Sequence, residues 1–249
     1  MRVGIFGFGF VGQALAHRLK SHEIAIYDPP KNHCKIPEDI DVAFVCVPTP
    51  TVNSLQDYSY IHDALKVCSA PVVFMKSTVL PGCCDTWSLE YDKTIVACPE
   101  FLSRATAHKD IYSQAIIVGD SGYEFARDLF KGQEIITMTN TEAELVKYTH
   151  NTFGALKVTY FNMIYEACKK LGSDYEKVKS GVLNSSGYIN PQHTEVPGSD
   201  GKFGFGGPCL PKDSSAFVTH LRHLSTTGSI ALKDLLKANK VFRGECESD

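Results

Sequence analysis

The 249-residue sequence lacks several features that would place it in other classes of protein. It contains no apolar run long enough to span a membrane, and its first residues lack the apolar core and cleavage site of a signal peptide. The formal net charge is -3 and no run of basic residues occurs, which argues against a nucleic-acid partner. These absences predict a globular, cytoplasmic protein that binds neither membranes nor nucleic acids.

The sequence also lacks a Cys-x-x-Cys pair, although it contains nine cysteines. The odd number and the spacing disfavour a disulfide framework and a zinc site, so no metal is expected. Cys46, Cys98 and Cys168 lie in apolar runs and are predicted to be small core residues. Cys209 differs from them because of its neighbours.

Cys209 lies in a glycine-rich stretch, Gly198–Asp213, that contains five glycines. Glycines allow the backbone to reach positive φ and to lie close to a ligand. Pro211 and Asp213 indicate the start of a helix, and the positive end of the helix dipole stabilises a thiolate. The stretch alone therefore leaves two interpretations open: a nucleophilic cysteine, or a tight turn that contains a structural one.

The N-terminal segment has the pattern of a dinucleotide-binding fingerprint. A strand at Arg2–Phe6 precedes Gly-x-Gly-x-x-Gly, a helix follows over Gln13–Lys20, and a second strand, Ile24–Tyr27, ends at an acid. Such glycines let a pyrophosphate approach the helix N-terminus, and the acid accepts hydrogen bonds from the adenosine ribose, which favours NAD over NADP. The alternative is a tight turn without a ligand. The candidate cofactor-binding residues here are Gly7, Gly9, Phe10, Val11, Gly12 and Asp28.

Further apolar strands alternate with helices along the first half of the chain. They are predicted at Asp41–Val47, Val72–Met75, Thr94–Ala97, Ala115–Val118 and Glu134–Met138. This alternation predicts an α/β fold, a Rossmann-like doubly wound parallel sheet of roughly six to eight strands. Polar residues follow three of the strands, namely Thr49, Thr78 and Glu100, which indicates one crevice at the carboxyl ends of the strands.

The second half of the chain is predicted to be helical. One long helix should begin near Thr141, contain a single glycine, Gly154, and end before Gly172, with a length of about 45 Å. Lys147 and Asn151 share one face of it, although their spacing alone favours a solvated polar stripe. The predicted domains are a Rossmann-like NAD-binding domain at 1–140 and an all-α central domain with the long helix at 141–249.

Several motifs resemble the UDP-glucose/GDP-mannose dehydrogenase family. They occur in the order of that family and extend over the chain from Arg2 to about Asn239. The matching segments are Gly7–Gly12, Val47–Pro50, Lys76–Val79, Pro99–Leu102, Glu144–Lys147 with Asn151, and Gly204–Asp213. The last of these motifs is highly specific.

The resemblance implies an activity and a cofactor. Members of the family oxidise the C6 alcohol of a nucleotide sugar, here UDP-glucose, to the acid by two hydride transfers to NAD. In this family Cys209 would be the nucleophile that attacks the intermediate aldehyde. Lys147 and Asn151 would stabilise the negative charge on the reacting oxygen, and Asp213 would orient a water or the lysine.

The resemblance assigns roles to further residues as well. Glu100 would be the base for thioester hydrolysis, and Thr78 would hold a water or the nicotinamide end of NAD, with Thr49 also on the cofactor side. The residues expected to contact the substrate are Glu100, Phe101, Leu102, Lys147, Asn151, Gly206 and Lys212. The central helices would form a homodimer.

The sequence departs from the family pattern in two places. Arg104 stands where the family usually has a second acid, and we expect the C-terminal nucleotide-binding domain of the family to be missing. These departures keep two alternatives open: a non-catalytic or regulatory NAD-binding subunit that pairs with a full-length dehydrogenase, and a two-electron dehydrogenase of another substrate, such as a 3-hydroxyacid or a polyol.

Overall fold

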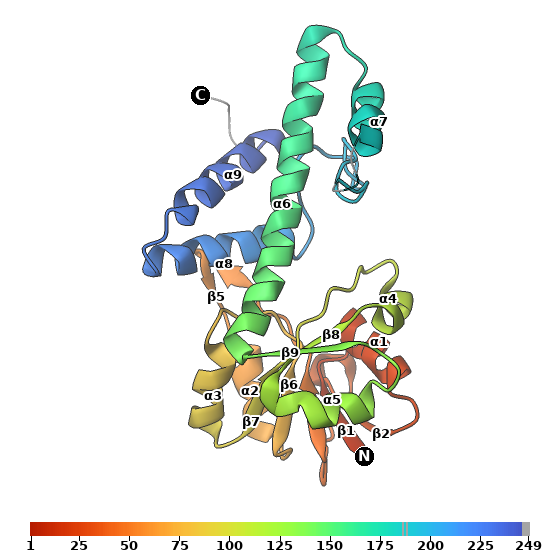
Figure 1. Ribbon diagram of the computed structural model, residues 1–249. Helices are drawn as coiled ribbons and strands as arrows, with labels where there is room; N and C mark the ends of the chain where they lie inside the picture. The colour runs from red at the N-terminus through yellow and green to blue at the C-terminus, as the bar shows by residue number, and fades with distance from the viewer. Residues whose placement is uncertain (186, 188, 246–249) are drawn as a thin grey trace. The chain divides into compact units, whose positions relative to one another are not determined.

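The computed structural model describes residues 1–185, 187 and 189–245. Cys246 and the remainder of the C-terminal tail lie outside the described residues. The chain forms two compact units (Figure 1). The first comprises Met1–Val52 and Gln56–Lys147, and the second comprises Asn53–Leu55 and Tyr148–Asp249.

The first unit is built on a five-stranded parallel sheet with the strand order β2-β1-β3-β6-β7. The chain reverses its winding direction between β1 and β3, as in dinucleotide-binding folds. The strands are β1 (Arg2–Phe6), β2 (Glu23–Tyr27), β3 (Val42–Val45), β6 (Val72–Met75) and β7 (Thr94–Ala97).

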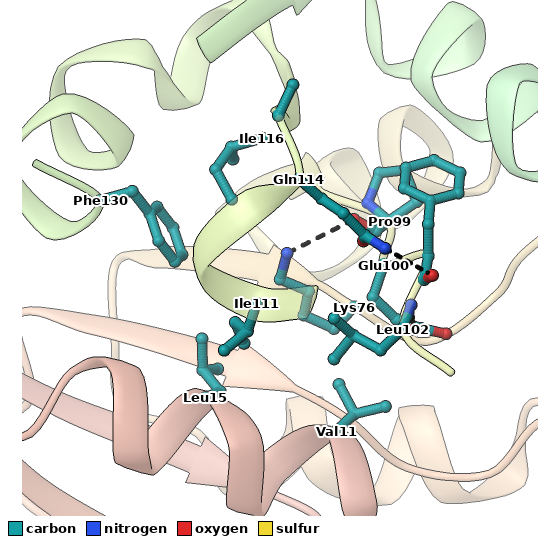
Figure 2. Close-up of a pocket in the computed structure, with 12 residues that line it drawn as sticks. Val11, Leu15, Lys76, Pro99, Glu100, Leu102, Ile111, Gln114, Ile116 and Phe130 are labelled. Atoms are coloured by element: carbon teal, nitrogen blue, oxygen red, sulfur yellow. Dashed lines mark hydrogen bonds between the residues drawn. The ribbon is translucent and has the colours of Figure 1, made fainter. Parts of the chain in front are cut away.

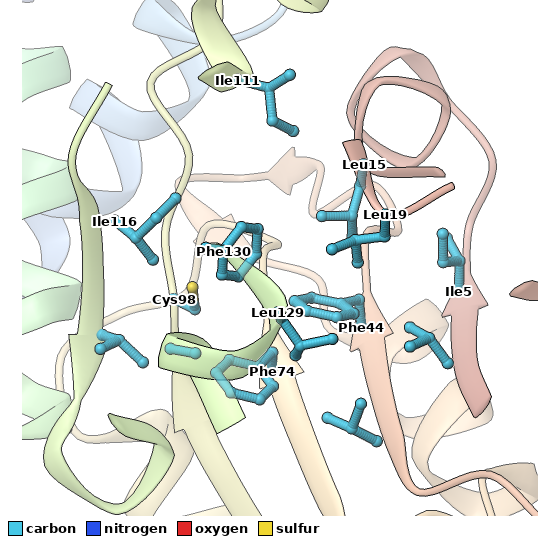
Figure 3. Close-up of a cluster of buried hydrophobic side chains, with 14 of the residues drawn as sticks. Ile5, Leu15, Leu19, Phe44, Phe74, Cys98, Ile111, Ile116, Leu129 and Phe130 are labelled. Carbon is cyan, nitrogen blue, oxygen red and sulfur yellow. The ribbon is translucent and has the colours of Figure 1, made fainter. Parts of the chain in front are cut away.

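Helices cover both faces of this sheet, because alternate strand residues point to opposite sides and nearly all of them are apolar. On one face α1 (Phe10–Arg18), α4 (Ala107–Ser113) and α5 (Tyr123–Leu129) enclose a core in which Phe44 and Phe74 stack at 5.0 Å between ring centroids (Figure 3). On the other face α2 (Ser59–Val67) and α3 (Cys83–Tyr91) pack over a core that includes Ala43, Val45 and Met75.

The remaining strands do not extend the main sheet. β8 (Ile116–Gly119) and β9 (Ile135–Met138) pair with each other in parallel as a separate two-stranded sheet. Two short strands, β4 (Thr51–Val52) and β5 (Leu55–Gln56), form a hairpin, and 3-10 turns occur at Pro29–Lys31 and Asp120–Gly122. The prediction of one sheet of six to eight strands was therefore wrong in number, while the doubly wound α/β arrangement is confirmed.

The long helix α6 extends over Asn140–Leu171 and ends as predicted at Gly172, which has a φ of 65°. It begins at Asn140, two residues before the start expected after a Thr141 cap, because the cap is Thr139. The Thr139 backbone N–H donates to Glu142 Oε2 at 2.8 Å, and the Glu142 backbone N–H donates to Thr139 Oγ1 at 3.3 Å. This reciprocal pair is a capping box.

The second unit contains the rest of α6 and three further helices, α7 (Tyr175–Ser185), α8 (Leu210–His223) and α9 (Gly228–Phe242). Leu232, Leu235 and Leu236 of α9 pack with Ala155 of α6 and with Phe205. The predicted helical second half is thus confirmed. Within the described part of the chain, no helix is both long and apolar enough to cross a membrane.

Candidate active site

The glycine loop after β1 has the steric form that a dinucleotide requires. A Cβ on Gly7 would lie 2.7 Å from the Cys46 carbonyl oxygen, and one on Gly12 would lie 2.2 Å from the Gly7 carbonyl oxygen, so both positions need glycine for close packing. A Cβ on Gly9 would meet no atom within 4 Å. Gly9 therefore leaves open space at the N-terminus of α1, whose unpaired N–H groups suit a pyrophosphate.

Asp28 lies at the end of β2, beside this loop. Its Oδ2 accepts a hydrogen bond of 2.6 Å from the Phe8 backbone N–H, and Lys31 Nζ donates to the Phe8 carbonyl at 2.5 Å. The acid is thus fixed in place by the glycine loop itself. This arrangement fits an acceptor for ribose hydroxyls next to a phosphate-binding turn.

The loops that follow β3 and β6 are tied together by a hydroxyl and an amide. Thr49 is almost fully buried, and its Oγ1 donates to the Thr78 carbonyl at 2.9 Å. Gln56 Nε2 donates to the same carbonyl at 2.8 Å and to Thr49 Oγ1 at 3.1 Å. Thr49 therefore fixes the position of the Thr78 backbone at the carboxyl edge of the sheet.

Lys147 and Glu100 form a buried ion pair in the first unit. Lys147 Nζ lies 3.1 Å from Glu100 Oε1, and the two side chains are only 7% and 12% exposed. Lys147 Nζ also donates to the Glu100 carbonyl and lies 5.3 Å from the centre of the Phe101 ring, while Glu100 Oε2 accepts from the Leu102 backbone N–H at 2.7 Å. The structure thus brings Lys147 together with Glu100, Phe101 and Leu102, all of which the sequence analysis had selected. Lys147 is buried and does not lie on a solvated stripe of the helix.

A second buried lysine, Lys76, lies next to the loop that contains Pro99 and Glu100. Its Nζ donates to the Pro99 carbonyl at 3.4 Å and lies 5.6 Å from the centre of the Phe130 ring (Figure 2). The pocket that these side chains line has a volume of only about 20 Å³, which is room for about one water molecule. It is too small to hold a sugar or a nucleotide.

Cys209 occupies the N-cap position of α8 in the second unit. Its carbonyl accepts the first helical hydrogen bond, from the Asp213 backbone N–H at 3.0 Å, and Pro211 lies at the second helical position. The residue is half-buried and forms no disulfide. A thiol placed at a helix N-terminus gains stabilisation of its thiolate form from the unpaired N–H groups.

Asn151 and Asp213 form a buried polar pair in the same unit. Asn151 Nδ2 donates to Asp213 Oδ2 at 2.7 Å, and the two residues are 5% and 1% exposed. Lys212 Nζ lies 2.5 Å from the other carboxylate oxygen, Oδ1. Asp213 is thus held from both sides within the first turn of the helix that begins after Cys209.

Two asparagines hold the glycine-rich stretch before Cys209. Asn162 Oδ1 on α6 accepts from the Gly204 backbone N–H at 2.9 Å. Asn239 on α9 accepts from the Phe205 N–H at 2.7 Å and donates to the Phe205 carbonyl at 3.0 Å. These contacts fix the backbone that leads to the cysteine.

Several other thiols in the described chain are buried. Cys98 and Cys168 are buried as predicted. Cys46 is half-buried as a residue, but burial of its thiol raises the pKa to about 12. Burial likewise raises the pKa of Cys84 well above its ordinary value. Cys46 and Cys84 are therefore poor nucleophiles at neutral pH, because the thiolate is the reactive form.

The sequence-based prediction missed several residues of the site. Gln56 and Asn239 act through hydrogen bonds to backbone atoms distant in sequence, which no local pattern reveals. The burial of Lys76 was also missed. Gly154, noted only as the single glycine of the predicted long helix, faces the ring of His193: a Cβ there would lie 3.3 Å from His193 Nε2. Arg104, the departure from the family pattern, lies 5.6 Å from the centre of the Phe10 ring at the start of α1.

The first unit has the fold and loop geometry of an NAD-binding domain, and the second unit presents a helix-capping cysteine beside a buried Asn–Asp pair. Both features are typical of the class of NAD-dependent dehydrogenases in which a helical domain follows the cofactor-binding domain. Two family models agree with this class. The model of the UDP-glucose/GDP-mannose dehydrogenase NAD binding domain matches residues 31–131, and the model of the central domain matches residues 141–240. The chain belongs to the UDP-glucose/GDP-mannose dehydrogenase family, and its cofactor is NAD.

The chain is also similar to individual proteins along most of its length. The chain is 28% identical to a UDP-glucose 6-dehydrogenase of Rickettsia typhi, over 83% of this chain and 50% of the relative. It is 28% identical to a GDP-mannose 6-dehydrogenase of Pseudomonas aeruginosa, over 96% of this chain and 68% of the relative. The solved structure of a UDP-glucose dehydrogenase from Pyrobaculum islandicum superimposes with a TM-score of 0.82 at 24% identity, over 96% of this chain and 68% of that one. The chain spans about half the length of the first of these relatives.

Proposed function

We propose that this protein oxidises the C6 alcohol of a nucleotide sugar, UDP-glucose, to the carboxylic acid through a covalent intermediate on Cys209. Bound NAD accepts one hydride in each of two oxidations. The observation that supports the proposal most strongly is the position of Cys209 at the start of α8, one helical turn before the buried Asp213. The name of the Rickettsia relative supports the choice of UDP-glucose.

The chemistry assigns a task to each residue. In the first oxidation the alcohol loses a hydride and a proton and becomes an aldehyde. The Cys209 thiolate then adds to the aldehyde carbon while the aldehyde oxygen takes up a proton, which gives a thiohemiacetal. Loss of a second hydride and of the hydroxyl proton converts the thiohemiacetal to a thioester. Water, deprotonated by Glu100, hydrolyses the thioester, so that the acid leaves and the thiol is restored. Two molecules of NAD are reduced for each sugar.

Charge on the reacting oxygen must be stabilised in each step. We assign this task to the Lys147 ammonium and the Asn151 amide, which are four positions apart on α6. Asp213 positions Asn151 through the bond to its Nδ2. We assign Lys212 and Gly206 to contacts with the substrate. On the cofactor side we assign the glycine loop and Asp28 to the adenosine half of NAD, and Thr49 and Thr78 to its nicotinamide end.

We also propose a homodimer formed through α6. Apolar side chains that are about half exposed recur on this helix at a spacing of three or four residues, namely Phe153 (63%), Leu156 (49%), Tyr160 (53%) and Met163 (52%). Such a row forms one stripe of a helix, and a helix in a second copy could cover it. Multi-angle light scattering of the wild type and of a Phe153→Glu/Tyr160→Glu variant tests this assignment: the wild type should be a dimer and the variant a monomer.

The activity is tested by mixing the purified protein with UDP-glucose and excess NAD and following NADH. We expect two NADH per sugar and UDP-glucuronate as the product. No NADH with UDP-glucose or GDP-mannose, despite measurable NAD binding, would mean a non-catalytic NAD-binding protein instead. One NADH per sugar with an aldehyde or ketone product would mean a two-electron dehydrogenase.

A further inference from the structure

Lys76 is a buried lysine of the first unit that the proposed mechanism does not use. The residue is 6% exposed and lines the same small pocket as the apolar side chains of Val11, Leu15 and Phe130 (Figure 2). Within the described part of the chain it forms no ion pair, and its one hydrogen bond reaches the Pro99 carbonyl oxygen at 3.4 Å. This long bond and the contact with the Phe130 ring offset little of the cost of burying an ammonium charge.

The loop that carries Glu100 depends on side chains for its backbone hydrogen bonds. Three consecutive carbonyl oxygens of this loop each accept a hydrogen bond from a side chain of a different segment. The donor and acceptor pairs are Lys76 with Pro99, Lys147 with Glu100, and Gln114 with Phe101. Among the described residues no backbone N–H donates to these three carbonyls. The position of the loop is therefore set by the three side chains, whereas most buried carbonyls are paired with backbone groups.

Lys76 and Lys147 hold the two peptide groups on either side of the Glu100 α-carbon. The Pro99 carbonyl belongs to the peptide group before this carbon, and the Glu100 carbonyl belongs to the one after it. Because peptide groups are planar, fixing both restricts the φ and ψ angles of Glu100 and so sets the direction of its Cβ. The carboxylate at the far end is held by Lys147 and by the Leu102 N–H.

The charge of Lys76 is not needed merely to satisfy a carbonyl. Gln114 Nε2, a neutral donor, holds the Phe101 carbonyl of the same loop at 3.0 Å. A hydrogen bond from an ammonium is about twice as strong as a neutral one, but here it requires a buried charge without an ionic partner. Such a cost to stability is typical of residues that serve a functional site. The benefit falls on the position of Glu100 and not on the stability of the fold.

We infer that Lys76 is a positioning residue that acts through Glu100 and accelerates the hydrolysis of the thioester. The inference deepens the proposed function and rests on it for the reaction that Glu100 serves. In that reaction the water oxygen adds to the thioester carbon while Glu100 takes one of the water protons. The carbon–sulfur bond then breaks, the sugar acid leaves, and the proton passes from Glu100 to the Cys209 thiolate. Lys76 acts before any bond changes, because it fixes the backbone from which Glu100 projects.

The Lys76→Met variant removes the ammonium and keeps an unbranched side chain. Displacement of a catalytic group by about 1 Å costs on the order of 100-fold, so the thioester should decay about 10- to 100-fold more slowly. Mass spectrometry of the intact protein, quenched during a single turnover, measures the sugar thioester on Cys209. The affinity for NAD should change by less than about 2-fold. Tm should stay within about 3 °C of the wild type, because loss of the bond is offset by loss of the buried charge. A lower Tm without slower thioester decay would show a merely structural role and overturn the inference.

A double variant tests whether Lys76 acts through Glu100. If it does, Lys76→Met should slow thioester decay by less than about 2-fold when Glu100→Gln is already present. Losses that multiply in Lys76→Met/Glu100→Gln would show an independent effect and overturn the inference. The matched control is Lys93→Met, since Lys93 Nζ donates to the Ala70 carbonyl at 3.1 Å at the opposite edge of the sheet. This control should hydrolyse the thioester like the wild type.

Hydrogen exchange separates this inference from the proposed function, because it does not require turnover. The backbone amides of Glu100, Phe101 and Leu102 should exchange at least about 5-fold faster in Lys76→Met than in the wild type or in Lys93→Met. Faster exchange in a protein whose wild type forms no NADH would support the positioning of Glu100 and refute the proposed activity. Two NADH per sugar in the wild type, with loop exchange and thioester decay unchanged in Lys76→Met, would overturn the inference alone. An inactive wild type with unchanged loop exchange in the variant would refute both.

Discussion

Glu144 should stabilise the first unit, because its buried carboxylate caps the N-terminus of a helix distant in sequence. Its Oε2 accepts from the Gly82 backbone N–H at 2.6 Å and its Oε1 from the Cys84 N–H at 2.9 Å, at the start of α3. The residue is 3% exposed. It belongs to the Glu144–Lys147 motif, but its role there is to hold α3 rather than to contact a substrate.

The size of the effect follows from these two bonds. Each charge-assisted hydrogen bond to a backbone N–H contributes about 1.5–3 kcal/mol to the free energy of unfolding. Removing the carboxylate also removes the cost of burying its charge, which offsets part of the lost stability. We expect Glu144→Ala to cost about 3 kcal/mol, which lowers Tm by about 6–12 °C for a unit of this size. Glu144→Gln keeps one acceptor oxygen and should cost about half as much.

The assay can use the single tryptophan. Trp87 lies in α3 and is 5% exposed, so its fluorescence reports unfolding of this region. Glu134→Ala removes an exposed acid from the same unit and serves as the control, with an expected Tm change below about 1 °C. The capping role would be refuted if Glu144→Ala had the same Tm as the wild type. It would also be refuted if Glu144→Gln lowered the Tm as much as Glu144→Ala does.

A pH series gives an independent check on the same residue. Burial raises the pKa of Glu144 above its ordinary value of 4.5, against the opposing effect of its two backbone hydrogen bonds. The folded state therefore binds the proton more tightly than the unfolded state does. The relevant pH range lies between 4.5 and the higher pKa that Glu144 has in the folded protein. As the pH falls through this range, the free energy of unfolding of the wild type should rise relative to that of Glu144→Gln. A constant difference between the two proteins across that window would contradict this reasoning.

Three further predictions concern the cofactor and the loop before Cys209. Asp28→Ala should weaken NAD at least about 10-fold, because the ribose acceptor and the Phe8 anchor are both lost; equal weakening of NAD and UDP-glucose in calorimetry would contradict the cofactor placement. Gly12→Ala should reduce NAD binding below detection, since the added Cβ would lie 2.2 Å from the Gly7 carbonyl oxygen; near-normal NAD affinity would show that the turn can relax. Asn239→Ala removes both bonds to the Phe205 backbone and should lower the NADH formation rate about 10-fold or more, while NAD binding, measured by calorimetry, stays unchanged; an equal fall in NAD binding would point to general unfolding.

The sequence predicted those parts of the fold that depend on local patterns. Apolar runs such as Val72–Met75 and Thr94–Ala97 are strands with the predicted bounds, and Gly172 ends α6 as expected. Two short helices, α3 and α4, were missed. α3 has little amphipathic pattern, and part of its stability comes from Glu144, some 60 residues away, a contact that no local pattern contains.

The candidate site was predictable as a set of residues but not as an arrangement. Motifs supplied Lys147, Asn151 and Cys209, whereas helical spacing alone favoured a solvated stripe for the first two. The structure buries Lys147 against Glu100 and Asn151 against Asp213, because each pairs with a group from another segment of the chain. Such pairings depend on tertiary contacts, which no local sequence pattern contains.

The central claim is that Cys209 forms the covalent intermediate of the second oxidation. The most direct measurement compares the wild type with Cys209→Ala and quantifies both NADH and the carboxylic acid formed from UDP-glucose. The account predicts two NADH per sugar and stoichiometric acid in the wild type, with no acid from Cys209→Ala although that variant still binds NAD. Acid formed by Cys209→Ala at the wild-type rate would contradict it.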